Sequence, residues 1–238
     1  MADHAPLVWD QIGEHWYENG VDKTVLYKFD KTNKTYGAGV AWNGVTSIEE
    51  SPSGAESNKF YADNIEYLNL TSAEEYGATL NAYDYPDEFE SCNGGAEVAP
   101  GVHIGQQPRD TFALAYRTLK GNDADENAGY VIHLVYGCKA APSSKSHSTK
   151  NDSPEPVEMS WELSTTQVPV TGHKPTATID IDSTKTDSTK LTAFEKIIYG
   201  STEADARIPL PDEVARLLGT AAAAAGGGNA TGDGNNLG

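Results

Sequence analysis

The residues from Tyr61 to Phe89 mix aromatic rings with carboxylates, a combination that carbohydrate-cleaving sites use. The stretch reads YADNIEYLNLTSAEEYGATLNAYDYPDEF. A glycosidase needs a pair of carboxylates at a defined separation, one of them with a raised pKa. Glu74 and Glu75 are adjacent, so in a strand they point to opposite faces and in a turn they are solvated. The chain has 35 acidic residues, so such pairs arise by chance. We interpret these carboxylates as solvated or interfacial.

Other side chains that do chemistry also lack the required spacing. No two of the 6 histidines stand at i, i+2 or i, i+4 as zinc ligands often do. The chain has no G-x-S-x-G, Walker or G-x-G-x-x-G sequence. Asp180, Asp182 and Asp187 offer oxygen ligands, but the glycine and final glutamate of a calcium-binding EF-hand loop are missing. His133 falls in an apolar run and is predicted to be a hydrogen-bonded core or interface residue. We therefore predict no enzyme, no cofactor and no metal.

Charge and cysteine usage narrow the class of protein. Lys and Arg total 17 against 35 Asp and Glu, a formal net charge of −18, which argues against affinity for nucleic acid or anionic membranes. No signal peptide or apolar membrane-spanning run is visible, so the protein is expected to begin in a cytoplasm. Reduced thiols are the default there, and the sequence leaves open whether Cys92 and Cys138 pair.

Period-two patterns predict a mainly β chain. VLYKFD (25–30) is expected to form a strand, and Asn43-Gly44 is a strong turn dipeptide. TFALAYRT (111–118) alternates like a half-buried strand, and YVIHLVYGCKA (130–140) is apolar on both faces like a central strand.

Two further segments alternate in the same way. VEMSWELS (157–164) should turn Val157, Met159, Trp161 and Leu163 to one face. ATIDIDS (177–183) should turn Ile179 and Ile181 inward, with Asp180 and Asp182 outward. These patterns are typical of strands with one buried face.

The period changes after Thr186. LTAFEKIIYG (191–200) gathers Leu191, Phe194, Ile197 and Ile198 on one helical face, with a glycine as the stop. LPDEVARLLG (210–219) predicts a second short helix, since proline and acidic residues suit its first turn.

The segments around this domain are predicted to be irregular. Residues 1–20, with Trp9 and Trp16, are expected to form an arm laid over the domain or a neighbour. Ser51–Lys59 and Ser143–Pro156 are small and polar and should be exposed loops. Residues 220–238 are rich in Ala, Gly and Asn and are predicted to be disordered, which leaves 21–219 as the β domain.

Several segments, read in order, resemble one family. They are 61–89, IGQQPRDTFALAYRTLKGND (104–123), GYVIHLVYGCKAAPSSKSHSTKNDSPEPVEMSWELSTTQVPV (129–170), HKPTATIDIDSTK (173–185) and IPLPDEV (208–214). Their order and spacing are similar to those of the major tail (tail tube) proteins of long-tailed bacteriophages that infect Gram-positive hosts. The resemblance extends from about Val21 to about Leu218, although no single motif in it is chemically diagnostic.

The resemblance implies an antiparallel β-sandwich or barrel of the tail tube type, with one or two short helices near the C-terminus. Subunits of that family form hexameric rings, and the rings stack into the tube that conducts the genome. Expected partners are further copies of the chain, other phage tail proteins (tape measure, tail terminator and distal tail) and passing DNA, which is not bound specifically. The expected location is the virion tail after assembly in the host cytoplasm. No membrane contact is expected.

Two groups of residues are candidates for assembly contacts under this resemblance. Candidate ring-stacking residues lie in the predicted polar loops Ser47–Lys59 and Ser143–Pro156: Glu49, Glu50, Ser51, Glu56, Asn58, Lys145, His147 and Lys150. Candidate subunit-contact residues are aromatic: Trp9, Trp16, Tyr83, Tyr85 and Phe89. The helix predicted at Leu191–Tyr199 is a weaker candidate for such contacts.

Three alternatives stay open. The first is an acidic β-sandwich module that binds carbohydrate or protein through exposed tyrosines and carboxylates. The second is an acidic glycoside hydrolase. The third is a tube protein of a contractile injection or secretion system, which a sheath partner would distinguish from a phage tail.

Overall fold

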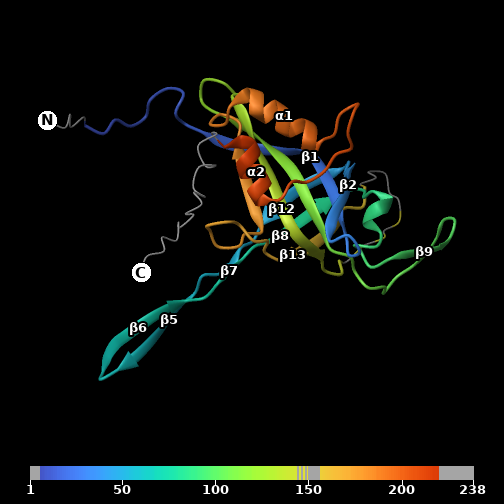
Figure 1. The fold of residues 1–238 in the computed structure, drawn as a ribbon, viewed down its shortest axis with the longest axis horizontal. Helices are drawn as coiled ribbons and strands as arrows, with labels where there is room; N and C mark the ends of the chain where they lie inside the picture. The colour runs from blue at the N-terminus through green and yellow to red at the C-terminus, as the bar shows by residue number, and fades with distance from the viewer. Residues whose placement is uncertain (1–5, 144, 146, 148, 150–155, 220–238) are drawn as a thin grey trace, which may run out of the picture.

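The body of the chain is a curled antiparallel sheet (Figure 1). The computed structural model describes residues 6–143, 145, 147, 149 and 156–219. The strands of the body lie in the order β2-β1-β11-β12-β13-β8-β3, and β14 pairs with β12. Their bounds are β1 Tyr17–Asp30, β2 Thr35–Ala41, β3 Val45–Glu50, β8 Gly77–Ala82, β11 Phe112–Gly121, β12 Gly129–Ala140, β13 Met159–Ser164 and β14 Thr178–Asp182. The prediction of a mainly antiparallel β fold is confirmed.

The sheet closes back on itself. β2 and β3 stand at opposite ends of the strand order, yet only residues 42–44 separate them in the chain. Gly44 has a φ of 82°, a left-handed conformation that glycine adopts without steric cost. The Asn43-Gly44 turn therefore joins the two ends of the sheet and not two paired strands. The result is a helix-covered half (β2, β1, β11, β12 and β14) that faces an opposite half (β13, β8 and β3).

An aromatic core fills the space between the two halves. Trp161 and Phe89 are almost completely buried at its centre, with ring centres 5.3 Å apart and an interplanar angle of 81°. The other buried residues of this core are Leu26, Trp42, Leu80, Ala82, Cys92, Phe112, Leu114, Tyr116, Val135, Cys138, Ala140, Met159 and Leu163. Cys92 and Cys138 are buried and free. Burial raises the pKa of the Cys92 thiol to about 11, so this thiol is unreactive at neutral pH.

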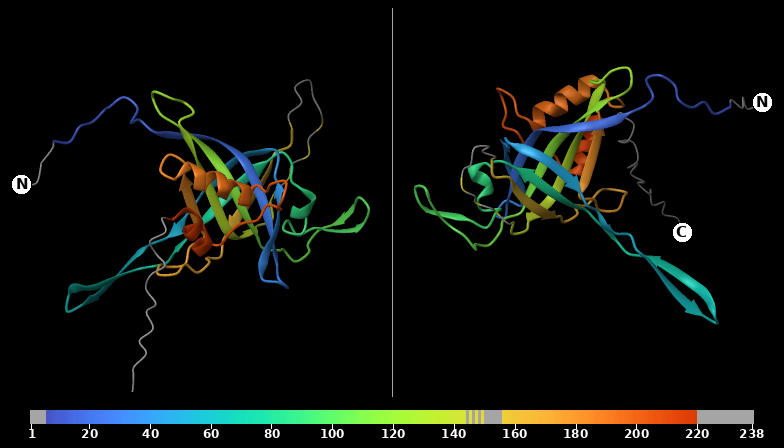
Figure 2. Two further views of the ribbon diagram at one scale, coloured as in Figure 1. Left: turned by 45° about the horizontal axis from the view of Figure 1, so that its top comes forward. Right: turned by 180° about the vertical axis from the view of Figure 1, so that it is seen from behind.

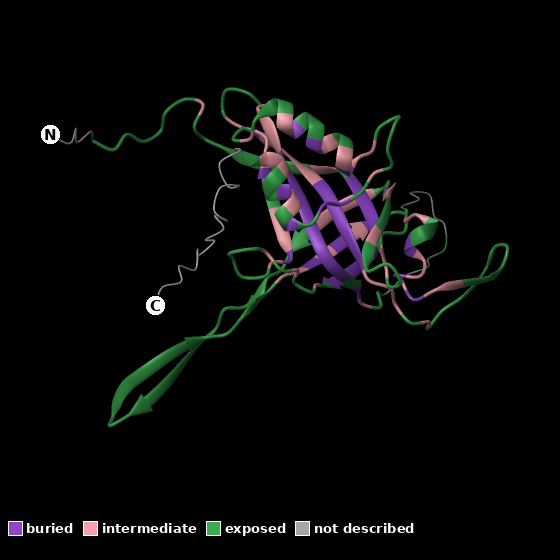
Figure 3. Cartoon of the chain, in the orientation of Figure 1, coloured by how far each residue is buried: buried purple, intermediate pink, exposed green. Residues whose placement is uncertain are grey.

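A second core lies on the outer face of the helix-covered half. Helix α1 (Ser188–Ile198) and helix α2 (Pro211–Leu218) cover this face, as Figures 1 and 3 show. The buried residues here are Val25, Tyr27, Ala113, Ala115, Ile132, Leu134, Tyr136, Ile181, Leu191, Phe194, Ile198, Ile208 and Val214. β11 was predicted to be half-buried, which is wrong for its first half. Ala113 and Ala115 are fully buried because the helices pack over them.

Local signals account for both helices. The Asp187 carboxylate accepts hydrogen bonds from the backbone N–H groups of Thr189 and Lys190, which caps the start of α1. α2 begins at Pro211, has acidic residues in its first turn and stops at Gly219. Both helix predictions are confirmed. β12 is confirmed as a central strand, since it pairs with β11 along one edge and with β14 and β13 along the other.

Some predicted boundaries were wrong. β1 begins at Tyr17, so the structure places the last part of the predicted 1–20 arm inside a strand. Val157 lies before β13 and is exposed, because the alternating pattern reaches beyond the paired residues. The tail at 220–238 lies outside the described residues.

Two further hairpins, built from three strand pairs, and one helical turn follow outside the body. β4 (Ser53–Gly54) pairs with β7 (Glu74–Glu75), β5 (Ser57–Ala62) with β6 (Ile65–Thr71), and β9 (Ala96–Ala99) with β10 (Val102–Ile104). A 3₁₀ turn, η1, spans Asp87–Phe89. The prediction of a loop over Ser51–Lys59 was therefore wrong. Its side chains are polar because they are not buried, but its backbone still forms cross-strand hydrogen bonds.

Candidate functional site

A long β-hairpin leaves the body between β3 and β8. We call residues 51–76 the hairpin arm; β4 and β7 form its root, and β5 and β6 form its outer part (Figure 1). Asp63 and Asn64 form its tip, and both have left-handed φ values, 51° and 64°. That pair of conformations is typical of a type I′ turn. Lys59 pairs with Glu66 across the strands at 2.9 Å. Every residue of β5 and β6 is exposed (Figure 3).

The hairpin arm carries apolar side chains on both of its faces. On β6, Ile65 and Tyr67 point to one face, and Leu68 and Leu70 point to the other. The exposed fractions are Phe60 50%, Tyr61 68%, Ile65 64%, Tyr67 70%, Leu68 38% and Leu70 57%. Clustered exposed apolar side chains are unusual on a monomer and mark interaction surfaces. An isolated two-stranded hairpin is also marginal in water. The hairpin arm therefore has the properties of an element that is stabilised by a partner.

The segment before β1 has the same character. Residues 6–16 run away from the body (Figure 1) and expose several large apolar side chains. Their exposed fractions are Leu7 77%, Val8 62%, Trp9 72%, Ile12 88% and Trp16 46%. Several contacts tie its end to the body; for example, Gly13 N donates to Asp123 Oδ1 at 2.9 Å, and Lys120 Nζ lies 5.1 Å from the centre of the Trp16 ring. We call residues 6–16 the N-terminal segment.

The β9–β10 hairpin projects on the side of the body away from the hairpin arm, as both views in Figure 2 show. Val98, Val102 and Ile104 are exposed on it by 59%, 51% and 42%. Apolar projections thus extend from opposite ends of the molecule. Such a molecule can contact neighbours at both ends at once.

The candidate ring-stacking residues lie in separate parts of the fold. Glu49 and Glu50 belong to β3, and Glu50 Oε1 accepts a hydrogen bond from the Tyr116 hydroxyl at 2.7 Å. Ser51, Glu56 and Asn58 belong to the hairpin arm. Lys145 and His147 are exposed. Lys150 lies outside the described residues.

The candidate subunit-contact residues divide between surface and core. Trp9, Trp16 and Tyr83 are exposed, Tyr83 by 50%. Tyr85 is half-buried and its hydroxyl donates to Glu90 Oε2 at 2.9 Å. Phe89 is fully buried in the aromatic core of its own chain. It has no surface to offer a neighbour, so the prediction of a subunit contact is corrected for Phe89.

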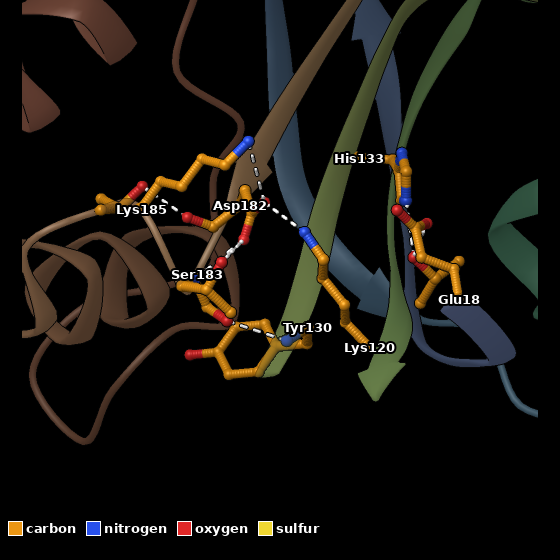
Figure 4. Close-up of polar contacts among 10 residues, drawn as sticks. Glu18, Lys120, Tyr130, His133, Asp182, Ser183 and Lys185 are labelled. Carbon is orange, nitrogen blue, oxygen red and sulfur yellow. Dashed lines mark hydrogen bonds and ion pairs between the residues drawn. The ribbon is translucent and has the colours of Figure 1, made fainter. Parts of the chain in front are cut away.

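A polar network lies on the face of the helix-covered half that is turned away from the helices (Figure 4). His133 Nδ1 is 2.8 Å from Asp180 Oδ1, and His133 Nε2 is 2.9 Å from Thr118 Oγ1. Thr118 Oγ1 in turn lies 3.0 Å from Glu18 Oε2. The His133 ring stacks on Tyr116 at a centre-to-centre distance of 4.6 Å. The prediction that His133 is a buried, hydrogen-bonded residue is confirmed.

The Thr118–His133–Asp180 geometry resembles that of a nucleophile, a base and an orienting carboxylate. Two features argue against nucleophilic catalysis here. The Thr118 hydroxyl donates its single proton to Glu18 Oε2, which leaves no proton for His133 Nε2 to accept from it. β11 also lies between β1 and β12, so backbone N–H groups beside Thr118 are used by the sheet and offer no oxyanion hole. The network is better explained as a clamp between β1, β11, β12 and β14. Sequence reasoning missed Glu18 and Thr118, because their meeting depends on strand register.

An ion pair extends this network along β14. Lys120 Nζ lies 2.5 Å from Asp182 Oδ2, and Lys185 Nζ lies 3.8 Å from the same oxygen (Figure 4). Partial burial works to raise the pKa of Asp182, but hydrogen bonds from Lys120 and Thr184 outweigh it and hold the pKa at about 2. Asp180, Asp182 and Asp187 thus face separate partners. They do not converge on a calcium site.

The described residues contain neither a membrane-spanning helix nor a cluster of metal ligands. No helix there is long and apolar enough to cross a membrane. No group of three or more His, Cys, Asp or Glu side chains in that part of the chain is arranged to hold a metal ion.

Comparison with known proteins found similarities among solved structures. No family model matches the chain, and no curated protein is significantly similar to it. A chain of an extracellular contractile injection system, the PVC sheath-tube complex in the extended state, matches with 12% identity and a TM-score of 0.32, covering 67% of this chain and 88% of that one. A chain of the anti-feeding prophage (AFP) baseplate matches with 7% identity and a TM-score of 0.32, covering 75% and 99%. Such scores do not assign the chain to a family.

Proposed function

We propose that this chain is a structural subunit that assembles with copies of itself into hexameric rings, and that the rings stack into a tail tube that conducts a phage genome. The hairpin arm is the observation that carries the proposal. Its outer strands expose apolar side chains on both faces and contact no core of their own chain. Burial of this surface against neighbouring copies would supply the free energy that the isolated hairpin lacks.

The charge of the chain supports the same role. A subunit with a formal net charge of −18 presents like charge to DNA phosphates. Repulsion between wall and phosphate lets DNA pass without binding. The resemblance to tail tube proteins over 21–218 adds the hexameric ring, the other tail proteins as partners and the virion as the location.

The proposal assigns each group of candidate contact residues to one kind of assembly contact. The hairpin arm, with Glu56 and Asn58, is assigned to contacts between rings. The N-terminal segment, with Trp9 and Trp16, and the exposed Tyr83 are assigned to contacts between neighbouring subunits. Lys145 and His147 stay as further candidates for ring stacking.

The test compares the intact chain with a variant that lacks the hairpin arm. The Ser51 N–H donates to the Gly77 carbonyl at 2.8 Å, so the ends of the arm are close enough for a short turn. Replacing residues 52–75 by Asn-Gly should leave a folded monomer. Size-exclusion chromatography and negative-stain microscopy are then performed over a range of concentrations. We expect rings or tubes from the intact chain and monomers from the variant.

Tubes from the variant would contradict the assignment of the hairpin arm. An intact chain that stays monomeric at every concentration and instead binds a glycan saturably would favour the carbohydrate-binding module.

A further inference from the structure

A recess on the surface of β1 and β2 has the features of a binding site. It has a volume of about 320 Å³, and its lining includes Lys23, Thr24, Gly39, Tyr199 and Ala206. We call it the Lys23 recess. Its walls combine one ammonium group, two hydroxyl groups and the side-chain amide of Asn43 with apolar side chains. No other function described above uses these residues.

A β-bulge shapes the recess. Asp22 pairs with Arg117 and Val25 with Ala115, so Lys23 and Thr24 together oppose a single residue of β11. Lys23 has a φ of 49°, a left-handed conformation that is costly for a residue with a side chain. Bulges and such strained residues are found where a fold redirects a side chain. Here the bulge directs Lys23 over the Tyr199 ring, with Nζ 5.2 Å from the ring centre.

The polar groups of the recess lack partners. Thr24 is 4% exposed, and within the part of the chain that the structure describes its hydroxyl has no hydrogen-bond partner; the same is true of the Tyr199 hydroxyl. Buried hydroxyls without a partner cost free energy in a folded chain. The nearby carboxylate of Asp22 is engaged by Arg117, at 2.7 Å and 2.5 Å. The recess therefore holds an exposed cation that a carboxylate can pair with, and two buried hydroxyl donors beside it that a carboxylate reaches only when the side chains over them move aside.

The opposite wall of the recess is held in place by close packing. The Gly39 N–H donates to the Ala206 carbonyl at 2.8 Å, which pins the loop after α1 against β2. A Cβ at Gly39 would lie 2.6 Å from Tyr27 Cε1 and 2.9 Å from Ala206 Cβ, so only glycine allows this approach. A pre-formed, partly apolar cleft with a few polar groups is typical of a binding site.

We propose that the Lys23 recess binds the carboxylate of Asp63 at the hairpin-arm tip of a second copy of this chain. This inference rests on the proposed self-assembly. Asp63 leads the tip and has exposed Tyr61 and Ile65 close by, which match the apolar walls. In the outer part of the hairpin arm Glu66 is paired with Lys59, whereas Asp63 has no ion pair among the described residues. Figures 1 and 2 show the loop after α1 on the side of the body away from the hairpin arm. A tip-to-recess contact is therefore head-to-tail, and such contacts build open stacks.

A double-mutant cycle tests the contact. Lys23→Met removes the ammonium group, and Asp63→Asn removes the charge with a residue that suits a type I′ turn. Each single variant should raise the critical concentration for assembly about tenfold, and the double variant should raise it by no more than either one. Lys34→Met is the matched control, because Lys34 is also exposed with a left-handed φ, 55°. It should leave the critical concentration unchanged.

Thr24→Val separates a binding role from a structural one. Removing a hydroxyl without a partner should leave the Tm of the monomer unchanged or raise it. The same substitution should raise the critical concentration, since the carboxylate loses a donor. If the wild-type protein and both single charge variants assemble equally well, only this inference is overturned. The same holds if the effects of the two substitutions on the critical concentration multiply in the double variant. Wild-type protein that never assembles overturns the proposed function as well.

Discussion

Phe89 and Tyr83 show that aromatic residues close in sequence have different roles. Both belong to the same tyrosine- and acid-rich stretch, yet Phe89 is fully buried and Tyr83 is 50% exposed. The 3₁₀ turn at Asp87–Phe89 brings Phe89 under Trp42, with ring centres 4.5 Å apart. Composition could not distinguish the two residues, because they differ in tertiary contacts: the Phe89 ring packs in the aromatic core, whereas the Tyr83 ring lies on the surface.

This difference predicts separate effects on stability and assembly. Phe89→Ala should lower the free energy of unfolding by about 3–5 kcal/mol, since it leaves a cavity in the aromatic core. Tyr83→Ala should change it by less than about 0.5 kcal/mol and, as a candidate contact, should weaken assembly. Urea unfolding of the monomer and sedimentation of the polymer measure the two effects. A large loss of stability in Tyr83→Ala would contradict its placement on the surface.

The Lys120–Asp182 ion pair predicts a dependence of stability on acid pH. The folded-state pKa of the Asp182 carboxyl, about 2, lies below the ordinary value of 3.8. The stabilisation that this carboxylate gives is therefore fully present above pH 3.8 and is lost as the pH falls toward 2. Asp182→Asn should therefore cost about 1 kcal/mol at neutral pH, allowing for solvent screening, and less near pH 2. Urea unfolding across this range gives the comparison.

Asp205→Asn is the control for this prediction. Asp205 is exposed and forms no ion pair among the described residues. Equal costs of Asp182→Asn at both pH values would show that the carboxylate acts through packing and not through charge.

At the scale of elements, β12 holds the two halves of the sheet together. Its first part pairs with β14, and its last residues pair with β13. Gly137 lies between these parts with a φ of 62°, and a Cβ there would lie 2.3 Å from the Thr166 carbonyl oxygen. This position lets the strand change partners while Val135 and Cys138 both stay in the aromatic core.

Substituting this glycine should weaken the whole sheet. Gly137→Ala should lower the free energy of unfolding by more than about 2 kcal/mol, because backbone strain and a clash with a carbonyl add together. Gly172→Ala is the matched control, since Gly172 also has a left-handed φ, 77°, but has no atom within 4 Å of a Cβ. Thermal unfolding of the two variants isolates the clash. Equal Tm values would contradict the close approach at Gly137.

At the scale of the whole molecule, net charge opposes assembly. Copies with a formal net charge of −18 repel one another, and salt screens that repulsion. We expect the critical concentration to fall as the salt concentration rises from about 0.02 M to about 0.5 M. Light scattering at a series of protein concentrations measures it. A critical concentration that rises with salt would show that attractive ion pairs between copies outweigh the net repulsion.

Much of the body could be predicted from local patterns. The alternation in Met159, Trp161 and Leu163, the double-faced apolar run of β12 and the capped helix α1 are each set by residues near one another in the chain. The hairpin arm could not be predicted in this way. Its strands bury nothing within the chain, so the polar composition of Ser51–Lys59 indicated a loop, whereas the turn at Asp63-Asn64 and the cross-strand hydrogen bonds form a hairpin.

The candidate sites likewise divide into features that the local sequence sets and features that tertiary contacts set. The sequence by itself determined the acidic character, the antiparallel β class and the two C-terminal helices, because charge, side-chain period and caps act locally. Only the tertiary structure decided that Phe89 is buried, that Glu18 and Thr118 meet His133, and that Lys23, Thr24 and Tyr199 line one recess. Those meetings depend on strand register, a bulge and the packing of a helix end on a distant strand. Such features join residues that are far apart in sequence, and no local pattern encodes them.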